Sequence, residues 1–303
     1  MEIVPSEIKK IYQEGKNISS YLKNKLNIAY NSDKIIEFSY DLQAGSYQNT
    51  WANPELQELY KLYTKEIADT ILSTLTPTSV LEAGVGEATT FCGVLDNLPK
   101  NIESYGFDIS YSRISFAKKW IEEKKVENVN ICIGNLFDIP FLDSSIDVVY
   151  TYHSIEPNGG NEETILKELY RVTKKYLILF EPDYEGTTKE NKARMDSFVY
   201  CKDLKKTALK LGYNIVSEKK FINNLNANNP TLVTIIKKNT ENQAQEIKDI
   251  YACPKYKTPL KLYKKSQAYY SEKSLLMYPI IDDIPCLRIE NGILASKLFD
   301  NEG

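Results

Sequence analysis

The sequence predicts an α/β fold built on a doubly wound, seven-stranded, mostly parallel sheet. Short apolar runs alternate with helical segments between about residues 79 and 238, and repeated strand–helix units form sheets of this kind. The apolar runs are continuous, as expected for strands that are buried on both faces of a parallel sheet. A chain of 303 residues can form such a domain together with a smaller unit.

Helices are expected before the sheet. Spaced apolar residues in a polar background indicate helical structure over residues 5–26. A better-marked helix follows Asn53, a favourable N-cap, with Pro54 at its first position. We therefore interpret residues 1–76 as an N-terminal helical lid region that covers a sheet edge or a pocket.

Residues 77–238 should form the sheet and its covering helices. The expected strands are 79–85, 104–109, 129–133, 146–151, 176–181, 213–216 and 231–237, and the expected helices are 89–98, 112–125, 162–172 and 189–211. A polar linker is expected at 239–246. After it, short apolar runs rich in tyrosine and proline predict a small β-rich module over residues 247–303.

Composition excludes several classes of function. The formal net charge of −3 lacks the basic excess of a dedicated nucleic-acid binder. No apolar run approaches the ~20 residues of a membrane-spanning helix, and the first residues do not resemble a signal peptide. Five scattered cysteines without a CxxC pair fit free thiols in a reducing compartment, so we expect a cytoplasmic protein. One histidine, His153, excludes a histidine-rich metal site.

The strongest functional signal is a glycine-rich turn at the end of the first strand. Gly84 and Gly86 allow a tight turn and the close approach of a ligand to the backbone. Thr89 occupies the third glycine position of a dinucleotide fingerprint. The nearby Glu82 suits a cationic amino-acid group better than pyrophosphate. The turn therefore favours S-adenosylmethionine (SAM) as the ligand.

Polar residues also follow the next strands. Asp108 ends the second strand, where its carboxylate can accept hydrogen bonds from both ribose hydroxyls; a helix-capping role is the alternative. Gly134, Asn135 and Leu136 follow the third strand, and His153 follows the fourth.

With these blocks in order, residues 79–238 resemble the class I SAM-dependent methyltransferases, most closely their small-molecule branch. The shared blocks are strand-ExGxG, a second strand ending in Asp, GDxxxLPF and FDxVxxxxxxE. The resemblance implies a Rossmann-like methyltransferase fold and SAM as the cofactor. The family has Asp where this chain has Asn135, whose side-chain oxygen can still accept a hydrogen bond from adenine. The implied cofactor-binding residues are Glu82, Gly84, Gly86, Asp108, Ile109, Asn135, Leu136 and Tyr47.

Two of these site assignments have alternatives. Residues 40–47 resemble the loop that closes over SAM in this branch, so Tyr47 either touches the cofactor or packs in an ordinary surface loop. His153 lies at the carboxyl edge of the sheet, and its ordinary pKa of ~6.5 suits a general base for a hydroxyl or ammonium acceptor. The alternative role of His153 is to hydrogen-bond the cofactor or the loop 156–160.

Residues 251–260 and 278–286 resemble the small zinc-ribbon-like module that acts as an activator subunit of tRNA and protein methyltransferases. The CPxCxxxL pattern of that module has its second cysteine where this chain has Tyr256. Cys253 and Cys286 cannot supply the four ligands of a tetrahedral zinc site. We therefore expect a module without metal.

These observations lead to one main functional hypothesis and two alternatives. The main hypothesis is a SAM-dependent methyltransferase that acts on a small-molecule or carbohydrate-like acceptor. One alternative is a tRNA, rRNA or protein methyltransferase, against which stand the acidic pI and the absence of an NPPY-type motif at 152–155. The other is a non-catalytic SAM-binding regulatory protein. A nucleic-acid partner is disfavoured, and the oligomeric state, a homo-oligomer included, is left open.

Overall fold

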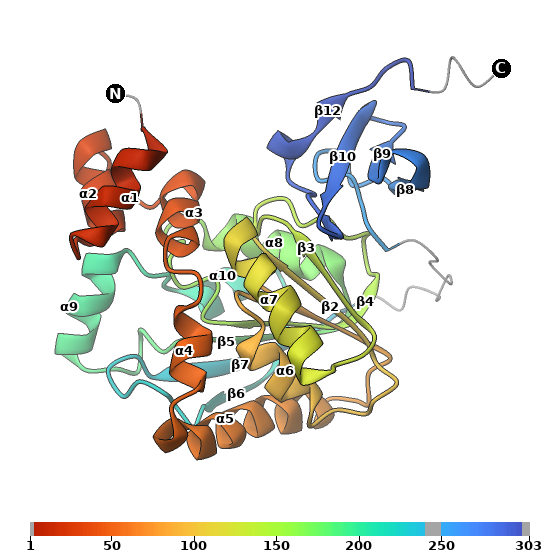
Figure 1. Cartoon of the computed structure of the whole chain (residues 1–303). Helices are drawn as coiled ribbons and strands as arrows, with labels where there is room; N and C mark the ends of the chain where they lie inside the picture. The colour runs from red at the N-terminus through yellow and green to blue at the C-terminus, as the bar shows by residue number, and fades with distance from the viewer. Residues whose placement is uncertain (1–2, 240–249, 299–303) are drawn as a thin grey trace.

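The computed structural model describes residues 3–239 and 250–298 (Figure 1). Its seven-stranded sheet has the order β3-β2-β1-β4-β5-β7-β6. The first five strands in this order are parallel, and β7 is antiparallel to both of its neighbours. The strands are β1 (Ser79–Ala83), β2 (Glu103–Asp108), β3 (Val129–Ile133), β4 (Ile146–Tyr152), β5 (Thr173–Pro182), β6 (Asn214–Lys220) and β7 (Thr231–Lys237). The predicted fold class is confirmed.

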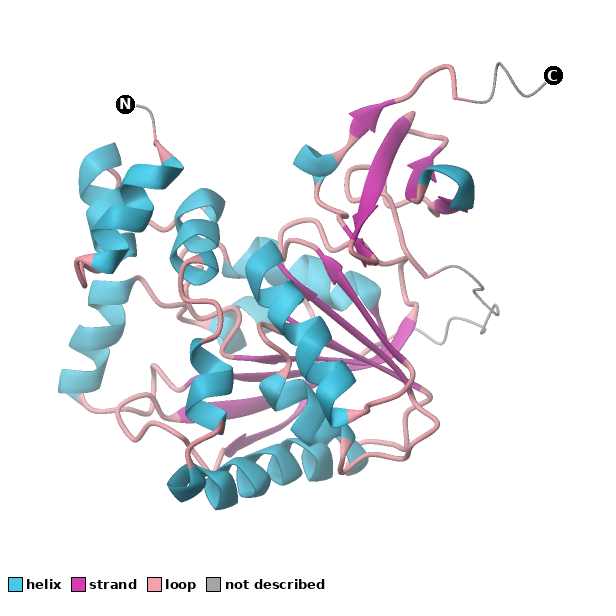
Figure 2. Ribbon diagram, viewed as in Figure 1, coloured by secondary structure: helices cyan, strands magenta, loops and turns pink. Residues whose placement is uncertain are grey.

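Helices cover both faces of the sheet (Figure 2). Successive residues of β1 point to opposite faces: Val80 is buried in the core shared with α5, α6 and α7, and Leu81 in the core shared with α8 and the C-terminal module. The chain order reverses between β1 and β4, which is the position where open α/β sheets bind ligands. The helices are α5 (Pro54–Leu72), α6 (Thr89–Leu95), α7 (Tyr111–Lys124), α8 (Glu162–Val172), α9 (Lys189–Phe198) and α10 (Leu204–Lys210).

The N-terminal region has a small core of its own, formed by Ile8, Ile18, Leu22 and Ile35. The expected helix over 5–26 is instead two helices, because Gly15 adopts a left-handed conformation with φ of 74°. Two further helices precede α5. The helices of this region are α1 (Pro5–Gln13), α2 (Ile18–Leu26), α3 (Asp33–Asp41) and α4 (Ser46–Trp51).

The helix expected over 189–211 is also two helices. Val199 follows α9 with φ of 59°, and Asp203 precedes α10 with φ of 53°. Two left-handed residues so close together end one helix and redirect the chain before the next one begins. By contrast, α5 begins as predicted, since the Asn53 side chain accepts a hydrogen bond from the Glu55 N–H.

The C-terminal module is a small antiparallel sheet with the order β11-β10-β9-β8 and with β12 paired to β10. Its backbone bonds to edge strand β3: Leu287 N donates to Ile133 O at 2.9 Å, and Cys286 forms a parallel bridge with Ile133. The module thereby covers an edge that would otherwise present unpaired backbone groups. Its strands are β8 (Lys261–Tyr263), β9 (Ala268–Ser271), β10 (Leu276–Ile281), β11 (Ile284–Pro285) and β12 (Ile293–Leu294).

The division at residues 76 and 238 stays a prediction, and the linker expected at 239–246 lies, apart from Asn239, outside the described residues. In the part of the chain that is described, no helix combines the length and the apolar character needed to cross a membrane.

The contact between α5 and α6 depends on a glycine. A Cβ on Gly93 would lie 2.7 Å from Cγ2 of the buried Thr64. We expect Gly93→Ala to lower the free energy of unfolding by about 1–3 kcal/mol, because neither helix can move without disturbing the sheet.

Urea denaturation of Gly93→Ala, Thr64→Ala and the double variant checks this expectation. The loss in the double variant should be smaller than the sum of the two single losses, because Thr64→Ala removes the clashing methyl group. Additive losses would contradict a direct contact at this point.

Candidate active site

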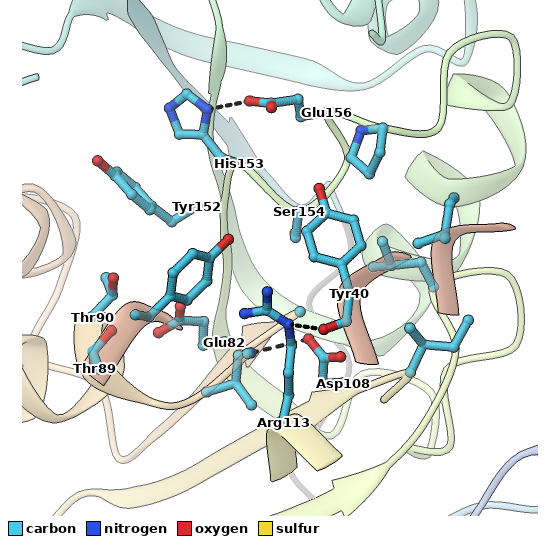
Figure 3. A pocket seen from close by; sticks show the side chains of 18 of the residues that line it. Tyr40, Glu82, Thr89, Thr90, Asp108, Arg113, Tyr152, His153, Ser154 and Glu156 are labelled. Atoms are coloured by element: carbon cyan, nitrogen blue, oxygen red, sulfur yellow. Dashed lines mark hydrogen bonds and ion pairs between the residues drawn. The ribbon is translucent and has the colours of Figure 1, made fainter. Parts of the chain in front are cut away.

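A cavity of about 590 Å³ lies at the carboxyl ends of β1, β2 and β4. Lid residues from α3, α4 and α5 cover it, and loops after the strands form its floor. Figure 3 shows Glu82 and Asp108 at one end and His153 with Glu156 at the other. The structure brings all nine residues that the sequence nominated into the lining of this cavity: Tyr47, Glu82, Gly84, Gly86, Asp108, Ile109, Asn135, Leu136 and His153.

Glu82 is a buried carboxyl group without a cationic partner. This residue lies one position before the end of β1. Its side chain is 2% exposed and accepts a 2.6 Å hydrogen bond from Tyr150 OH. Burial raises its pKa to about 8, and no lysine or arginine in the described part of the chain is paired with it. A cationic ligand group in the cavity would compensate this carboxylate, and the amino group of SAM has the required charge.

The glycine turn after β1 packs closely against the loop that follows β4. Gly84 has φ of 80°, and a Cβ there would lie 2.3 Å from Cβ of Ser154. The backbone of β1 therefore passes directly under the loop that follows β4, and only glycine is accommodated. The uncompensated carboxyl of Glu82 beside this turn fits the amino group of the methionine part of SAM.

Asp108 is held by backbone groups on both sides. Its Oδ2 accepts from Gly86 N at 3.0 Å, and its Oδ1 accepts from Ser110 N at 2.9 Å. Burial raises the pKa of Asp108, although Arg113 and these N–H groups oppose the rise. The N-cap of α7 is Ser110, whose Oγ accepts from Arg113 N at 3.1 Å. Asp108 is therefore not the cap residue, and its carboxylate faces the cavity.

Asn135 is oriented by two neighbours. Its Nδ2 donates to Asp33 Oδ2 at 2.7 Å, and its Oδ1 accepts from Phe137 N at 3.1 Å. Both Asn135 and Asp33 line the cavity. A carboxylate from the lid helix α3 thus lies beside Asn135. Sequence reasoning missed Asp33, because its only local signal is an acidic residue in the first turn of a helix.

A second missed residue, Glu87, fixes the lid. Its fully buried carboxylate accepts from the backbone N–H groups of Gly45, Tyr47 and Gln48 at 3.0, 3.4 and 3.0 Å, and pairs with Arg113 Nη1 at 3.4 Å. This carboxylate holds the start of α4 above the glycine turn. The Tyr47 ring lies 4.3 Å from the Arg113 guanidinium and lines the cavity, yet it remains 45% exposed.

His153 is held at the opposite end of the cavity. Its backbone is left-handed, with φ of 54°, and such strain is often found at functional sites. Nδ1 lies 2.5 Å from Glu156 Oε2, and Nε2 lies 2.7 Å from Thr231 Oγ1. Burial alone would lower the pKa of His153, but the hydrogen bond and charge of Glu156 raise it above its ordinary value. His153 therefore both bonds the following loop and lines the cavity.

The loop that carries Glu156 is itself oriented by Glu181 at the end of β5. The Glu181 carboxylate accepts from the backbone N–H groups of Ser154, Ile155 and Glu156, each at 3.1 Å. Burial raises the pKa of Glu181 to about 7. The Glu181 side chain thereby orders the histidine loop.

The two cysteines of the C-terminal module lie in different surroundings. Cys253 Sγ is 3.6 Å from both Ser274 Oγ and Tyr278 OH, whereas Cys286 lies at the β3 edge with Sγ 3.6 Å from Ile284 O. Across residues 3–239 and 250–298, no three His, Cys, Asp or Glu side chains are grouped as metal ligands. That this module holds no metal stays a prediction.

Comparison with known proteins places this site in a family context. Residues 76–274 match the family described as "Methyltransferase domain". Over 72 residues the chain is 35% identical to the demethylmenaquinone methyltransferase of Geobacillus sp. (strain WCH70). The matched segment covers 24% of this chain and 30% of that relative. The corresponding enzyme of Geobacillus kaustophilus is 33% identical over 72 residues, with the same coverage.

Two solved structures share the fold. A SAM-dependent methyltransferase from Aquifex aeolicus has a TM-score of 0.51 at 15% identity and covers 64% of this chain and 97% of its own. Magnesium protoporphyrin IX methyltransferase from Synechocystis PCC 6803, solved with bound S-adenosylhomocysteine (SAH), has a TM-score of 0.51 at 13% identity. The match covers 68% of this chain and 100% of that protein.

The raised pKa of Glu82 predicts that ligand binding releases a proton. At pH 7 a carboxyl group with a pKa of about 8 is mostly protonated, and a bound ammonium group lowers that pKa. SAH should therefore bind more tightly as the pH rises from 6 to 8. Calorimetry at pH 7 in two buffers of different ionisation enthalpy measures the proton release.

Glu82→Gln should abolish this release and weaken SAH binding about tenfold or more, since a charge-assisted hydrogen bond is lost. Wild-type binding without proton exchange, or release that persists in Glu82→Gln, would show that Glu82 does not face the ammonium group.

Proposed function

Because the chain belongs to the methyltransferase-domain family and is a SAM-dependent methyltransferase, we propose that it methylates a hydroxyl group on a small, uncharged, ring-containing acceptor of carbohydrate-like polarity. The observation that carries this proposal is the His153–Glu156 pair, which lines the same cavity as the cofactor-binding turn. In this proposal the glycine turn and the carboxylates beside it bind the cofactor, and His153 serves the acceptor.

The chemistry requires alignment and one proton transfer. SAM supplies a methyl group on a positively charged sulfur, and this methyl passes to the acceptor oxygen while the sulfur becomes a neutral thioether. A hydroxyl acceptor must lose its proton in the process. Glu156 holds Nδ1 of His153, so Nε2 is the atom that takes this proton, once the acceptor hydroxyl replaces its contact with Thr231. The Thr231 hydroxyl, 2.7 Å from Nε2, marks where an acceptor hydroxyl can be received.

The surroundings of His153 indicate the kind of acceptor. Tyr63 and Tyr152 are stacked with ring centroids 5.4 Å apart, and both line the cavity. Asn229 also lines it, and its buried Oδ1 has no hydrogen-bond partner within the described chain. Aromatic faces and a free amide acceptor suit a ring that carries hydroxyl groups. Among the described lining residues the single lysine or arginine is Arg113, which is engaged by Glu87, so the lining supplies no free cation for a phosphorylated acceptor.

The curated relatives support a small acceptor in a limited way. The Geobacillus proteins are named demethylmenaquinone methyltransferases, and demethylmenaquinone is a small molecule. Because the match covers 30% of each relative, it supports the size class of the acceptor and leaves its structure to experiment.

The base assignment predicts a specific pH dependence. Transfer from labelled SAM should be followed across sugar, lipid and RNA fractions, and then with the purified acceptor. Because only neutral imidazole accepts a proton, kcat/KM should rise with pH and level off above an apparent pKa higher than ~6.5. In Glu156→Gln this apparent pKa should fall, since the carboxylate that stabilises the imidazolium is gone.

His153→Ala should reduce kcat about 100-fold or more while SAH affinity stays unchanged. Equal turnover by His153→Ala would refute the base assignment. SAH binding without transfer to any fraction would favour the non-catalytic alternative, and transfer confined to RNA or protein would refute the small acceptor.

A further inference from the structure

The lid helix α3 carries three acidic residues at four-residue intervals, Asp33, Glu37 and Asp41. Residues four apart lie on one face of a helix, and each of these three bonds a different part of the molecule. Asp33 bonds Asn135 in the loop after β3 at 2.7 Å. Asp41 accepts from the backbone and side chain of Ser112, both at 3.0 Å, at the start of α7. The two ends of α3 are thus fixed to the methyltransferase core.

The middle residue, Glu37, bonds the C-terminal module. Its Oε1 lies 2.7 Å from Nη1 of Arg288, which follows β11. The Arg288 side chain is 6% exposed, so the guanidinium of this ion pair is shielded from water. The same Nη1 donates to Ile109 O at 3.4 Å, and Ile109 directly follows Asp108. One guanidinium therefore joins the lid helix to the loop that carries Asp108.

Pairing with the sheet edge delivers Arg288 to this position. Leu287 N donates to Ile133 O at the end of β3, so the module backbone runs beside β3 into the region where Gly134 and Asn135 begin. In Figure 1, α1–α3 lie at the upper left and the module at the upper right, with the top of α7 between them. On α3, Glu37 lies between Ile36 and Tyr40, and both of these residues line the cavity. A shift of α3 at Glu37 would therefore move a wall of the cavity.

We propose that Arg288 is a positioning residue for the cofactor: the C-terminal module uses it to hold α3 closed over the adenosine end of the SAM pocket. The module then acts within the chain as a brace for the lid. This proposal rests on the assignment of the cofactor pocket and is independent of the acceptor, because SAH binds without one.

The position of α3 affects the affinity for a ligand in the cofactor pocket. Residues of α3, α4 and α5 line the cavity, so the position of these helices sets the shape of the cofactor pocket. The observed dissociation constant equals that of the closed state divided by the fraction of molecules in that state. Loss of the Glu37–Arg288 contact lowers this fraction. The loss of this contact should raise the dissociation constant of any ligand that occupies the adenosine end, whatever group the ligand carries on its sulfur.

The test uses the full chain and three variants. Arg288→Met removes the guanidinium and keeps the length of the side chain, and Glu37→Gln removes the charge of its partner on α3. Glu290→Gln is the matched control, since Glu290 also pairs with Arg288 but belongs to the module. Calorimetry measures the binding of SAH and of 5′-methylthioadenosine, which lacks the amino-acid part. Hydrogen exchange follows the amides of residues 33–41, and thermal unfolding shows that each variant is folded.

Arg288→Met and Glu37→Gln should each raise both dissociation constants about tenfold, and the double variant should show no larger effect. Exchange over 33–41 should accelerate in both, while Glu290→Gln stays within about twofold of wild type. If Arg288→Met fails to fold, Glu37→Gln decides. Wild-type affinity in a folded Glu37→Gln, an equal loss in Glu290→Gln, or a loss for SAH without one for 5′-methylthioadenosine would overturn the proposal.

Discussion

The site is organised around a carboxyl group that the protein buries without a cation. Glu82 lies one position before the end of the central strand β1, between β2 and β4, where backbone pairing on both sides excludes water. A buried carboxylate is costly unless a partner compensates it, and Tyr150 supplies only one hydrogen bond. The missing charge is one that the cofactor carries. The left-handed turn at Gly84 lets the loop with Ser154 pack directly against the end of β1, and both Gly84 and the carboxyl group of Glu82 line the cavity.

Other carboxylates hold the cover of the pocket in place. Glu87 binds the backbone at the start of α4, and Asp33 and Asp41 fix the two ends of α3. Two of these contacts lie at or beside a nominated cofactor residue: Glu87 follows Gly86, and Asp33 bonds Asn135. These contacts tie the lid helices to the segments that form the cofactor pocket.

Sequence patterns predicted the sheet because most of its strands contain a short apolar run and five of the seven are parallel. The mostly exposed β6, Asn214–Lys220, extends beyond the run expected at 213–216. The site residues after these strands were also predicted, since strand ends meet at one edge of a parallel sheet.

Local patterns could not show the break at Val199, because a β-branched residue in the left-handed region reflects tertiary packing more than propensity. They also could not show Asp33 or Arg288, whose roles depend on contacts with residues about a hundred or more positions away.

A crystal structure of the full chain with SAH bound would test the central claim most directly. The account predicts the amino group of the ligand against Glu82, the ribose hydroxyls on Asp108, the adenine beside Asn135 and Asp33, and the sulfur facing the space before His153. SAH bound elsewhere, or in this cavity with its amino group away from Glu82, would contradict it.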